Sequence, residues 1–222
     1  MTSAYYTHIA SLHDPAACDG LQVSVSHEGG GASGSAVLSG DGAIDVVCPC
    51  YNPPKGFIDD LHSSMERLRA MYPRRRMRLI VVNDGSTRGF GPLERAGLLR
   101  SVPDTEIVDI PHAGKGAAIR AGIAGSEAPF VIYTDIDMPY VPESMRQVIE
   151  SVIAGYDVVI AVRNRSYRSR LSLLRKAMSY GSKALNRIFL NIPYTDTQGG
   201  LKGLSSITIY ANHYRNSNPL SN

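Results

Sequence analysis

The sequence has few cysteines, no long apolar run, and no lysine or arginine before Lys55. No apolar stretch approaches the roughly 18 residues of a membrane-spanning helix, so none is expected. The N-terminus lacks the basic-then-apolar order of a secretory signal, and its arginine-free start argues against a mitochondrial transit peptide. We therefore expect a cytoplasmic protein.

Only three cysteines occur in 222 residues. Cys48 and Cys50 share one face of a predicted strand because side chains alternate along an extended chain. They are too few for a zinc cluster and too close for an unstrained disulfide. We expect them to be reduced thiols in the core.

The length supports one substantial core. Nine of the fourteen residues in 29–42 are glycine or serine, which is the composition of a linker. We predict a disordered arm over residues 1–43, a folded domain over 44–204, and a polar, truncated or altered tail over 205–222.

Apolar runs typical of strands alternate with amphipathic segments typical of helices. The predicted strands are 44–50, 77–82, 106–110, 130–133 and 157–162, and the predicted helices are 57–71, 93–100 and 142–154, with another that follows the glycine-rich segment 112–120. This alternation predicts an α/β fold with a mostly parallel central sheet and helices on both faces.

Acidic residues follow two of the predicted strands: Asp84 after one, and Asp135 and Asp137 after another. Open α/β sheets bind ligands at the carboxyl ends of their strands. Carboxylates at positions i and i+2 can point to the same side, and their hard oxygens suit Mg²⁺ or Mn²⁺. The alternative is a solvated turn, the commoner role of an isolated D-x-D.

The glycine-rich segment brings Lys115 toward these acids. Unlike a Walker A loop, it has no serine or threonine after the lysine, and it does not fit the dinucleotide-binding G-x-G-x-x-G. Farther along, residues 163–195 hold eight basic residues and no acid. They predict a basic amphipathic helix, which either docks on the sheet or contacts an anionic acceptor or membrane. Arg175 and Ser179 share a face of this helix and could bind a phosphate.

Five segments together resemble family 2 glycosyltransferases of GT-A fold, most closely the polyprenyl- and dolichyl-phosphate sugar transferases. They are residues 46–52, 81–87, 114–120, 134–137 and 196–204, in the same order as in that family. One such motif would be weak, but five in order are specific. The resemblance implies a Rossmann-like nucleotide-binding half.

The resemblance also implies a role for each matching residue. The donor nucleotide would be bound by Pro49, Tyr51, Asn52, Asp84, Gly85, Ser86, Lys115 and Asp135. Asp84 would accept a hydrogen bond from the base. Asp135 and Asp137 would bind Mg²⁺ or Mn²⁺, and a cation there stabilises the departing diphosphate.

On the acceptor side, the resemblance places phosphate contacts at Arg163, Arg175 and Ser179. Asp196 would be the base, with Thr197 and Gln198 in the acceptor loop, whereas its alternative role is to cap that loop.

The implied activity is metal-dependent, inverting transfer of a hexose from a nucleoside diphosphate sugar to a polyprenyl or dolichyl phosphate. UDP-hexose is favoured over GDP-mannose. The expected partners are the donor, the lipid phosphate and, peripherally, an anionic membrane at the cytosolic face, but no nucleic acid. One alternative is transfer to a glycan or protein hydroxyl, and another is a truncated remnant that binds a sugar nucleotide without catalysis.

Three features depart from the family pattern. Pro53 and Pro54 stand where the family often has glutamate, and Asn83 replaces the first acid of D-D-G-S. After Leu204, the family usually continues with a helix, which the polar tail does not predict. The first two departures affect the donor site, and the third underlies the remnant alternative.

Overall fold

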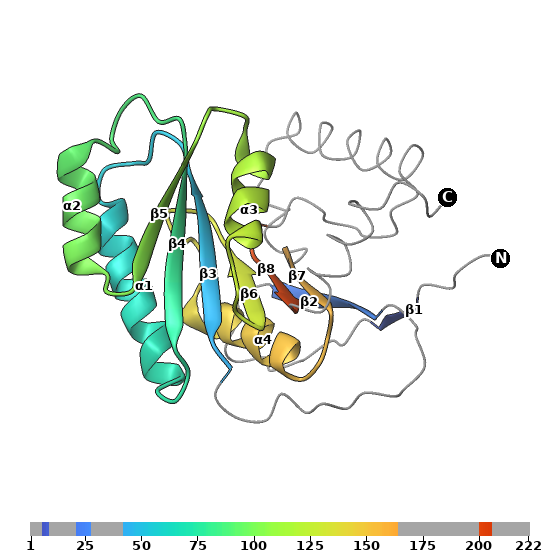
Figure 1. The fold of residues 1–222 in the computed structure, drawn as a ribbon. Helices are drawn as coiled ribbons and strands as arrows, with labels where there is room; N and C mark the ends of the chain where they lie inside the picture. Colours follow the sequence, from blue (N-terminus) through green and yellow to red (C-terminus); the bar gives the residue numbers. More distant parts are fainter. Residues whose placement is uncertain (1–5, 9–20, 28–41, 164–199, 206–222) are drawn as a thin grey trace, which may run out of the picture.

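The computed structural model describes residues 6–8, 21–27, 42–163 and 200–205 (Figure 1). The strands are β1 (Tyr6–His8), β2 (Leu21–His27), β3 (Ile44–Cys50), β4 (Met77–Asp84), β5 (Thr105–Ile110), β6 (Phe130–Tyr133), β7 (Val158–Arg163) and β8 (Lys202–Ser205). The helices are α1 (Phe57–Met71), α2 (Pro92–Ser101), α3 (Lys115–Ala124) and α4 (Pro142–Ile153).

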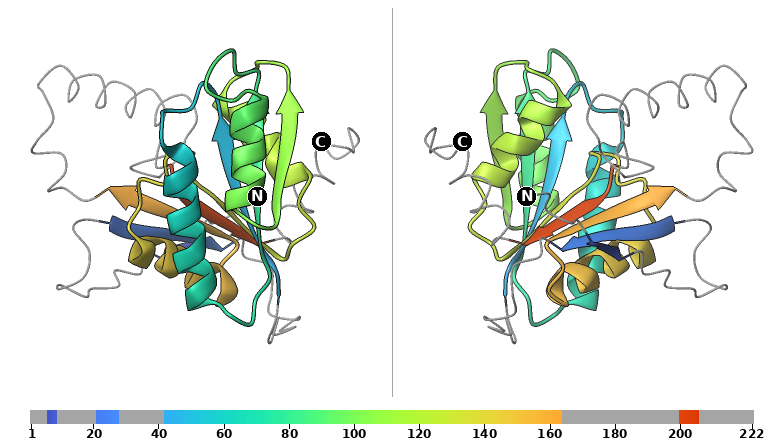
Figure 2. Two further views of the ribbon diagram at one scale, coloured as in Figure 1. Left: turned by 90° about the vertical axis from the view of Figure 1, so that its left-hand side faces the viewer. Right: turned by 90° about the vertical axis from the view of Figure 1, so that its right-hand side faces the viewer.

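The described strands form one mixed sheet in the order β1-β2-β7-β8-β6-β3-β4-β5. Strands β6, β3, β4 and β5 form a parallel block, so their carboxyl ends meet at one edge. Strand β8 lies antiparallel between β6 and β7, and β2 pairs antiparallel with β7. Figure 2 shows β2, β7 and β8 crossing the direction of β3 and β4, as expected for a strongly twisted sheet.

Helices cover both faces of the sheet, with α3 on the opposite side from α1 and α2 (Figure 1). The buried stripe of α1 follows helical spacing, which is why the sequence predicted this helix: Phe57, Leu61, Met65 and Leu68. Helix α3 packs closely on β3. Gly122 permits this approach, because a Cβ added there would overlap the side chain of Val47. Within the described residues, no helix has the length and apolarity needed to cross a bilayer.

The α/β prediction is confirmed, and β3 and α1 have the predicted bounds. One expectation is wrong, because β8 lies in a segment predicted to be a loop. Strands β1 and β2 lie within the arm 1–43, which was predicted to be mostly disordered. Strands β2 and β8 are both held by pairing with β7, and composition does not reveal such long-range partners.

Cys48 and Cys50 are buried free thiols in one apolar cluster, as predicted. Burial raises the pKa of Cys50 to about 11. Burial also raises the pKa of Cys48, with a further contribution from the negative charge of Asp135. Both thiols are therefore neutral core side chains at physiological pH.

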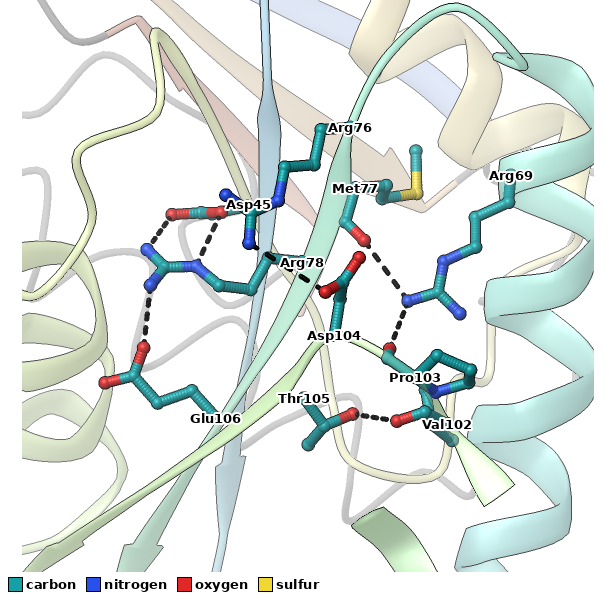
Figure 3. Close-up of polar contacts among 10 residues, drawn as sticks. All are labelled: Asp45, Arg69, Arg76, Met77, Arg78, Val102, Pro103, Asp104, Thr105 and Glu106. Atoms are coloured by element: carbon teal, nitrogen blue, oxygen red, sulfur yellow. Dashed lines mark hydrogen bonds and ion pairs between the residues drawn. The ribbon is translucent and has the colours of Figure 1, made fainter. Parts of the chain in front are cut away.

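A polar network lies toward the amino ends of the parallel strands (Figure 3). Asp45, which is 3% exposed, accepts hydrogen bonds from Nε (3.1 Å) and Nη2 (2.6 Å) of Arg78. It also accepts one from the hydroxyl of Ser126 at 2.6 Å. Arg78 donates from Nη1 to Glu106 at 2.7 Å. The network joins β3, β4 and β5 at the edge opposite their carboxyl ends.

Near this network, Arg69 of α1 contacts two backbone carbonyls (Figure 3). Its Nη2 donates to the carbonyl oxygen of Pro103 at 2.6 Å and to that of Met77 at 3.2 Å. One guanidinium thereby ties the helix to the starts of β4 and β5.

We predict that Arg78→Met lowers the free energy of unfolding by about 3 kcal/mol, because it leaves the Asp45 carboxylate buried without its cation. Urea denaturation followed by circular dichroism measures this change. Arg76→Met is the matched control, since Arg76 pairs with Asp104 where both side chains are exposed (70% and 54%). That control should cost less than about 1 kcal/mol. Equal losses in both variants would contradict the role given to Asp45.

Candidate functional site

Polar and aromatic side chains from four parallel strands gather at the carboxyl edge of the sheet. Tyr51 follows β3, Asp84 ends β4, His112 follows β5, and Asp135 follows β6. The sequence predicted this placement for the first, second and fourth of these residues. Pro49 lies within β3, opposite Val82 of β4.

Asp84 fixes the loop that leads into α3. Its side chain is 2% exposed, and its two oxygens accept hydrogen bonds from the backbone N–H groups of Ala113 (2.7 Å) and Gly114 (2.9 Å). Nδ1 of His112 lies 3.0 Å from Oδ2 and 3.0 Å from the backbone oxygen of Asp84. The carboxylate thus faces the loop, and its predicted contact with a nucleobase stays a prediction.

His112 is a site residue that the sequence reasoning missed. Its ring stacks on that of Tyr51, with centroids 4.3 Å apart and planes inclined by 21°. Gly85 has a φ of 66°, and a Cβ there would lie 3.0 Å from the backbone nitrogen of His112. The glycine therefore permits close approach of this loop. The signal in the sequence was an aromatic side chain just after the end of β5.

Asn52 and Ser86, both predicted to bind the donor, connect two loops of the site. Oδ1 of Asn52 accepts hydrogen bonds from the backbone N–H groups of Thr87 (2.9 Å) and Arg88 (3.1 Å). The backbone N–H of Asn52 donates to the hydroxyl of Ser86 at 2.9 Å. Asn52 has a φ of 49°, a conformation that asparagine tolerates better than most residues. These contacts give both residues a role in shaping the loops.

Asn83, a departure from the family pattern, is explained by Asp109. Its Nδ2 donates to Oδ1 of Asp109 at 2.7 Å, and its Oδ1 accepts from the N–H of Ser86 at 3.0 Å. Asp109 also forms two hydrogen bonds with Arg95, at 2.6 and 2.8 Å. The bonds from Arg95 and then Asn83 lower the pKa of Asp109 to about 2. An acid at position 83 would face an ionised carboxylate.

Lys115, the first residue of α3, pairs through its ammonium group with Oδ1 of Asp135. Gly200 approaches the other oxygen, because a Cβ added there would overlap Oδ2 of Asp135 and lie 2.9 Å from the Tyr140 hydroxyl. That hydroxyl is buried and has no hydrogen-bond partner in the described part of the chain. Gly200 and Tyr140 are further residues that the sequence reasoning missed.

The two acids of the D-x-D motif fit a metal site that a substrate completes. Asp135 is partly buried, whereas Asp137 is exposed. In the described ranges, no three histidine, cysteine or acidic side chains gather as a metal-binding group. Asp135 and Asp137 therefore offer at most two ligands, and Mg²⁺ is commonly bound by one or two carboxylates together with substrate phosphates.

The predicted acceptor residues lie mostly outside the described residues: Arg175, Ser179, Asp196, Thr197 and Gln198. The predicted basic helix also falls there. Arg163 ends β7, where its backbone is opposite Leu21 of β2. The acceptor assignments therefore remain predictions.

The order of strands and helices defines a protein of the GT-A type. Mannosyl-3-phosphoglycerate synthase from Rubrobacter xylanophilus matches with a TM-score of 0.51 at 16% identity, over 74% of this chain and 53% of that one. A glucosyl-3-phosphoglycerate synthase from Mycobacterium tuberculosis, solved with UDP, matches with a TM-score of 0.50 at 19% identity, over 81% and 62%. At these identities the likeness concerns the fold alone.

Residues 45–209 match the family model described as glycosyl transferase family 2, and the chain belongs to that family. An undecaprenyl-phosphate 4-deoxy-4-formamido-L-arabinose transferase from Pseudomonas paraeruginosa is 29% identical over 62% of this chain and 42% of its own length. Glycosyltransferase AglJ of Haloferax volcanii is 26% identical over 75% of this chain and 50% of its own. The chain thus spans half or less of the length of these relatives.

We predict that Asn83→Asp lowers the free energy of unfolding at pH 7 by about 2 kcal/mol, because a charged hydrogen bond is replaced by carboxylate repulsion. In a double-mutant cycle with Asp109→Asn, the double variant should be more stable than the sum of the single losses by about 1 kcal/mol. Chemical denaturation measures all four proteins. Additive losses would contradict a direct pairing of the two side chains.

The Asp109→Asn variant also allows a test by pH. Because the pKa of Asp109 is lowered to about 2, its ionised form contributes stability above its ordinary pKa of 3.8. That contribution is lost as the pH falls from about 4 toward 2. The stability difference between the wild type and Asp109→Asn should therefore shrink over this window.

Proposed function

We propose that this chain carries the donor-binding domain of a metal-dependent, inverting glycosyltransferase that moves a hexose from a nucleoside diphosphate sugar to a polyprenyl or dolichyl phosphate. The observation that carries the proposal is the meeting of Lys115 and Asp135 beside the loop held by Asp84. Family membership and relatives named for transfer to undecaprenyl phosphate support the acceptor class.

The donor side uses the carboxyl edge of the sheet. The exposed ring of Tyr51 offers a surface on which a nucleobase can stack. Lys115 and the start of α3 attract the diphosphate, because helix N-termini and ammonium groups both favour anions. Asp135 and Asp137 would hold Mg²⁺ or Mn²⁺, which would neutralise charge on the departing diphosphate. UDP-hexose is the proposed donor.

On the acceptor side, an oxygen of the lipid phosphate attacks the anomeric carbon as the bond to the diphosphate breaks, which inverts that carbon. Arg163, Arg175 and Ser179 are the proposed phosphate contacts. Asp196 is the proposed base, although a phosphate already ionised near neutral pH needs little deprotonation. The eight basic residues of 163–195 favour peripheral contact with an anionic membrane at the cytosolic face.

The donor proposal predicts that UDP or GDP raises the melting temperature in a Mn²⁺-dependent manner. Ligand binding to the folded state alone contributes about 2.7 kcal/mol at a hundredfold excess over Kd. Asp137→Ala should abolish the Mn²⁺ dependence while the unliganded protein melts as before. Thermal-shift and calorimetric titrations measure both effects.

Glu127→Ala is the matched control, since it removes an exposed carboxylate just before the amino end of β6. It should bind the diphosphate as the wild type does. If neither UDP nor GDP stabilises the wild type, the donor site is wrong. The non-catalytic alternative corresponds to donor binding without hydrolysis or transfer over a broad panel of acceptors.

Asp196→Asn distinguishes the acceptor classes. With a polyprenyl phosphate, we predict that transfer falls less than about tenfold, because the acceptor oxygen is already anionic. With a hydroxyl acceptor, loss of the general base should cost about 10²- to 10⁴-fold. Turnover of a radiolabelled donor with a short-chain polyprenyl phosphate measures this. A loss beyond a hundredfold with that acceptor would contradict the phosphate assignment.

A further inference from the structure

We propose that Lys115 acts as an internal counter-cation: it occupies Asp135 in the free protein and moves to the donor diphosphate on binding, which opens Asp135 to the divalent metal. Metal and diphosphate would then bind with positive coupling. This inference rests on the donor site of the proposed function and adds how the metal and the diphosphate come to bind there together.

Each oxygen of Asp135 has a close neighbour in the structure. The ammonium group of Lys115 pairs with Oδ1, and Gly200 lies so close to Oδ2 that a single added carbon would overlap it. The Asp135 side chain is 29% exposed. A metal ion that binds Oδ1 therefore competes with the ammonium group of Lys115.

Asp137, the second acid of the D-x-D motif, differs from Asp135 in its surroundings. It is exposed and forms no hydrogen bond or ion pair within the described ranges. Of the two acids of the D-x-D motif, Asp137 alone thus offers a metal an open carboxylate, and a single exposed carboxylate binds Mg²⁺ or Mn²⁺ weakly. Oδ1 of Asp135 becomes available as a further ligand when Lys115 leaves it.

The donor diphosphate attracts the ammonium group of Lys115 away from Asp135. The lysine side chain is 53% exposed, and ion pairs at such exposure are weak and easily exchanged. A diphosphate carries more negative charge than one carboxylate, and the start of α3 adds its own positive potential. Lys115 is the first residue of α3, so a short rotation of its side chain can follow the anion without movement of the helix.

The coupling must be reciprocal, because it is a free energy shared by two binding sites. If the diphosphate tightens Mn²⁺ binding by a given factor, Mn²⁺ tightens diphosphate binding by the same factor. Replacing Lys115 with a neutral side chain removes the competitor from Asp135. That variant should bind Mn²⁺ alone more tightly, lose diphosphate affinity, and lose most of the coupling.

Loss of one positive charge anywhere near the site would also favour a cation, so the test needs a charge-matched control. Arg120 provides it: this exposed residue is also on α3, and its Nη1 lies 3.6 Å from where a Cβ at Gly116 would be. Among the residues that the structure describes, Asp135 pairs with Lys115 and not with Arg120, so Arg120→Gln removes the same charge without freeing the carboxylate.

The experiment measures Mn²⁺ affinity by electron paramagnetic resonance and by calorimetry, with and without saturating UDP or GDP. In the wild type, the diphosphate should tighten Mn²⁺ binding by about tenfold or more. Lys115→Gln should bind Mn²⁺ alone about tenfold more tightly than the wild type and show less than about threefold coupling. Arg120→Gln should match the wild type within about twofold in both measurements.

Equal Mn²⁺ affinity of Lys115→Gln and Arg120→Gln would overturn the proposal, and so would undiminished coupling in Lys115→Gln. Unfolding curves of both variants check that the fold is retained. Failure of the proposed function gives a different result, since then no diphosphate binds the wild type with or without Mn²⁺. In that case Mn²⁺ alone still tests whether Lys115 blocks Asp135.

Discussion

The carboxylate of Asp84 is the group on which the site depends. It is almost fully buried, and two backbone N–H groups of the β5–α3 loop satisfy its charge. Because an unpaired buried charge is costly, this carboxylate holds the loop in one conformation. The loop in turn sets His112 against Tyr51 and starts α3 so that Lys115 reaches Asp135.

The two edges of the parallel block use charge differently. At the amino edge, the buried carboxylate of Asp45 forms a multiply bonded pair with the partly exposed Arg78 and so joins neighbouring strands. At the carboxyl edge, Asp137 is exposed and Lys115 makes only a half-exposed pair. Paired charges thus stabilise the amino edge, whereas the carboxyl edge keeps charged groups that a ligand can contact.

Local pattern was enough to predict β3, α1 and the acids at the strand ends, because hydrophobic periodicity and motif spacing are local properties. It could not predict β2 or β8, whose pairing depends on distant strands. Nor could it show that Gly200 abuts Asp135, or that Asn83 is matched to Asp109, since neither relationship exists before the chain folds. His112 was missed because its significance comes from stacking on Tyr51.

The position of β8 has a consequence for how the protein is made. Strand β8 lies late in the chain, yet it alone joins β6 to β7 in the described sheet, and β2 pairs to the sheet through β7. The parallel block can therefore form before β8 joins β1, β2 and β7 to it. Until β8 emerges, β6 and β7 have open edges, which are templates for pairing with other chains. These two edges close only when β8 pairs with both strands.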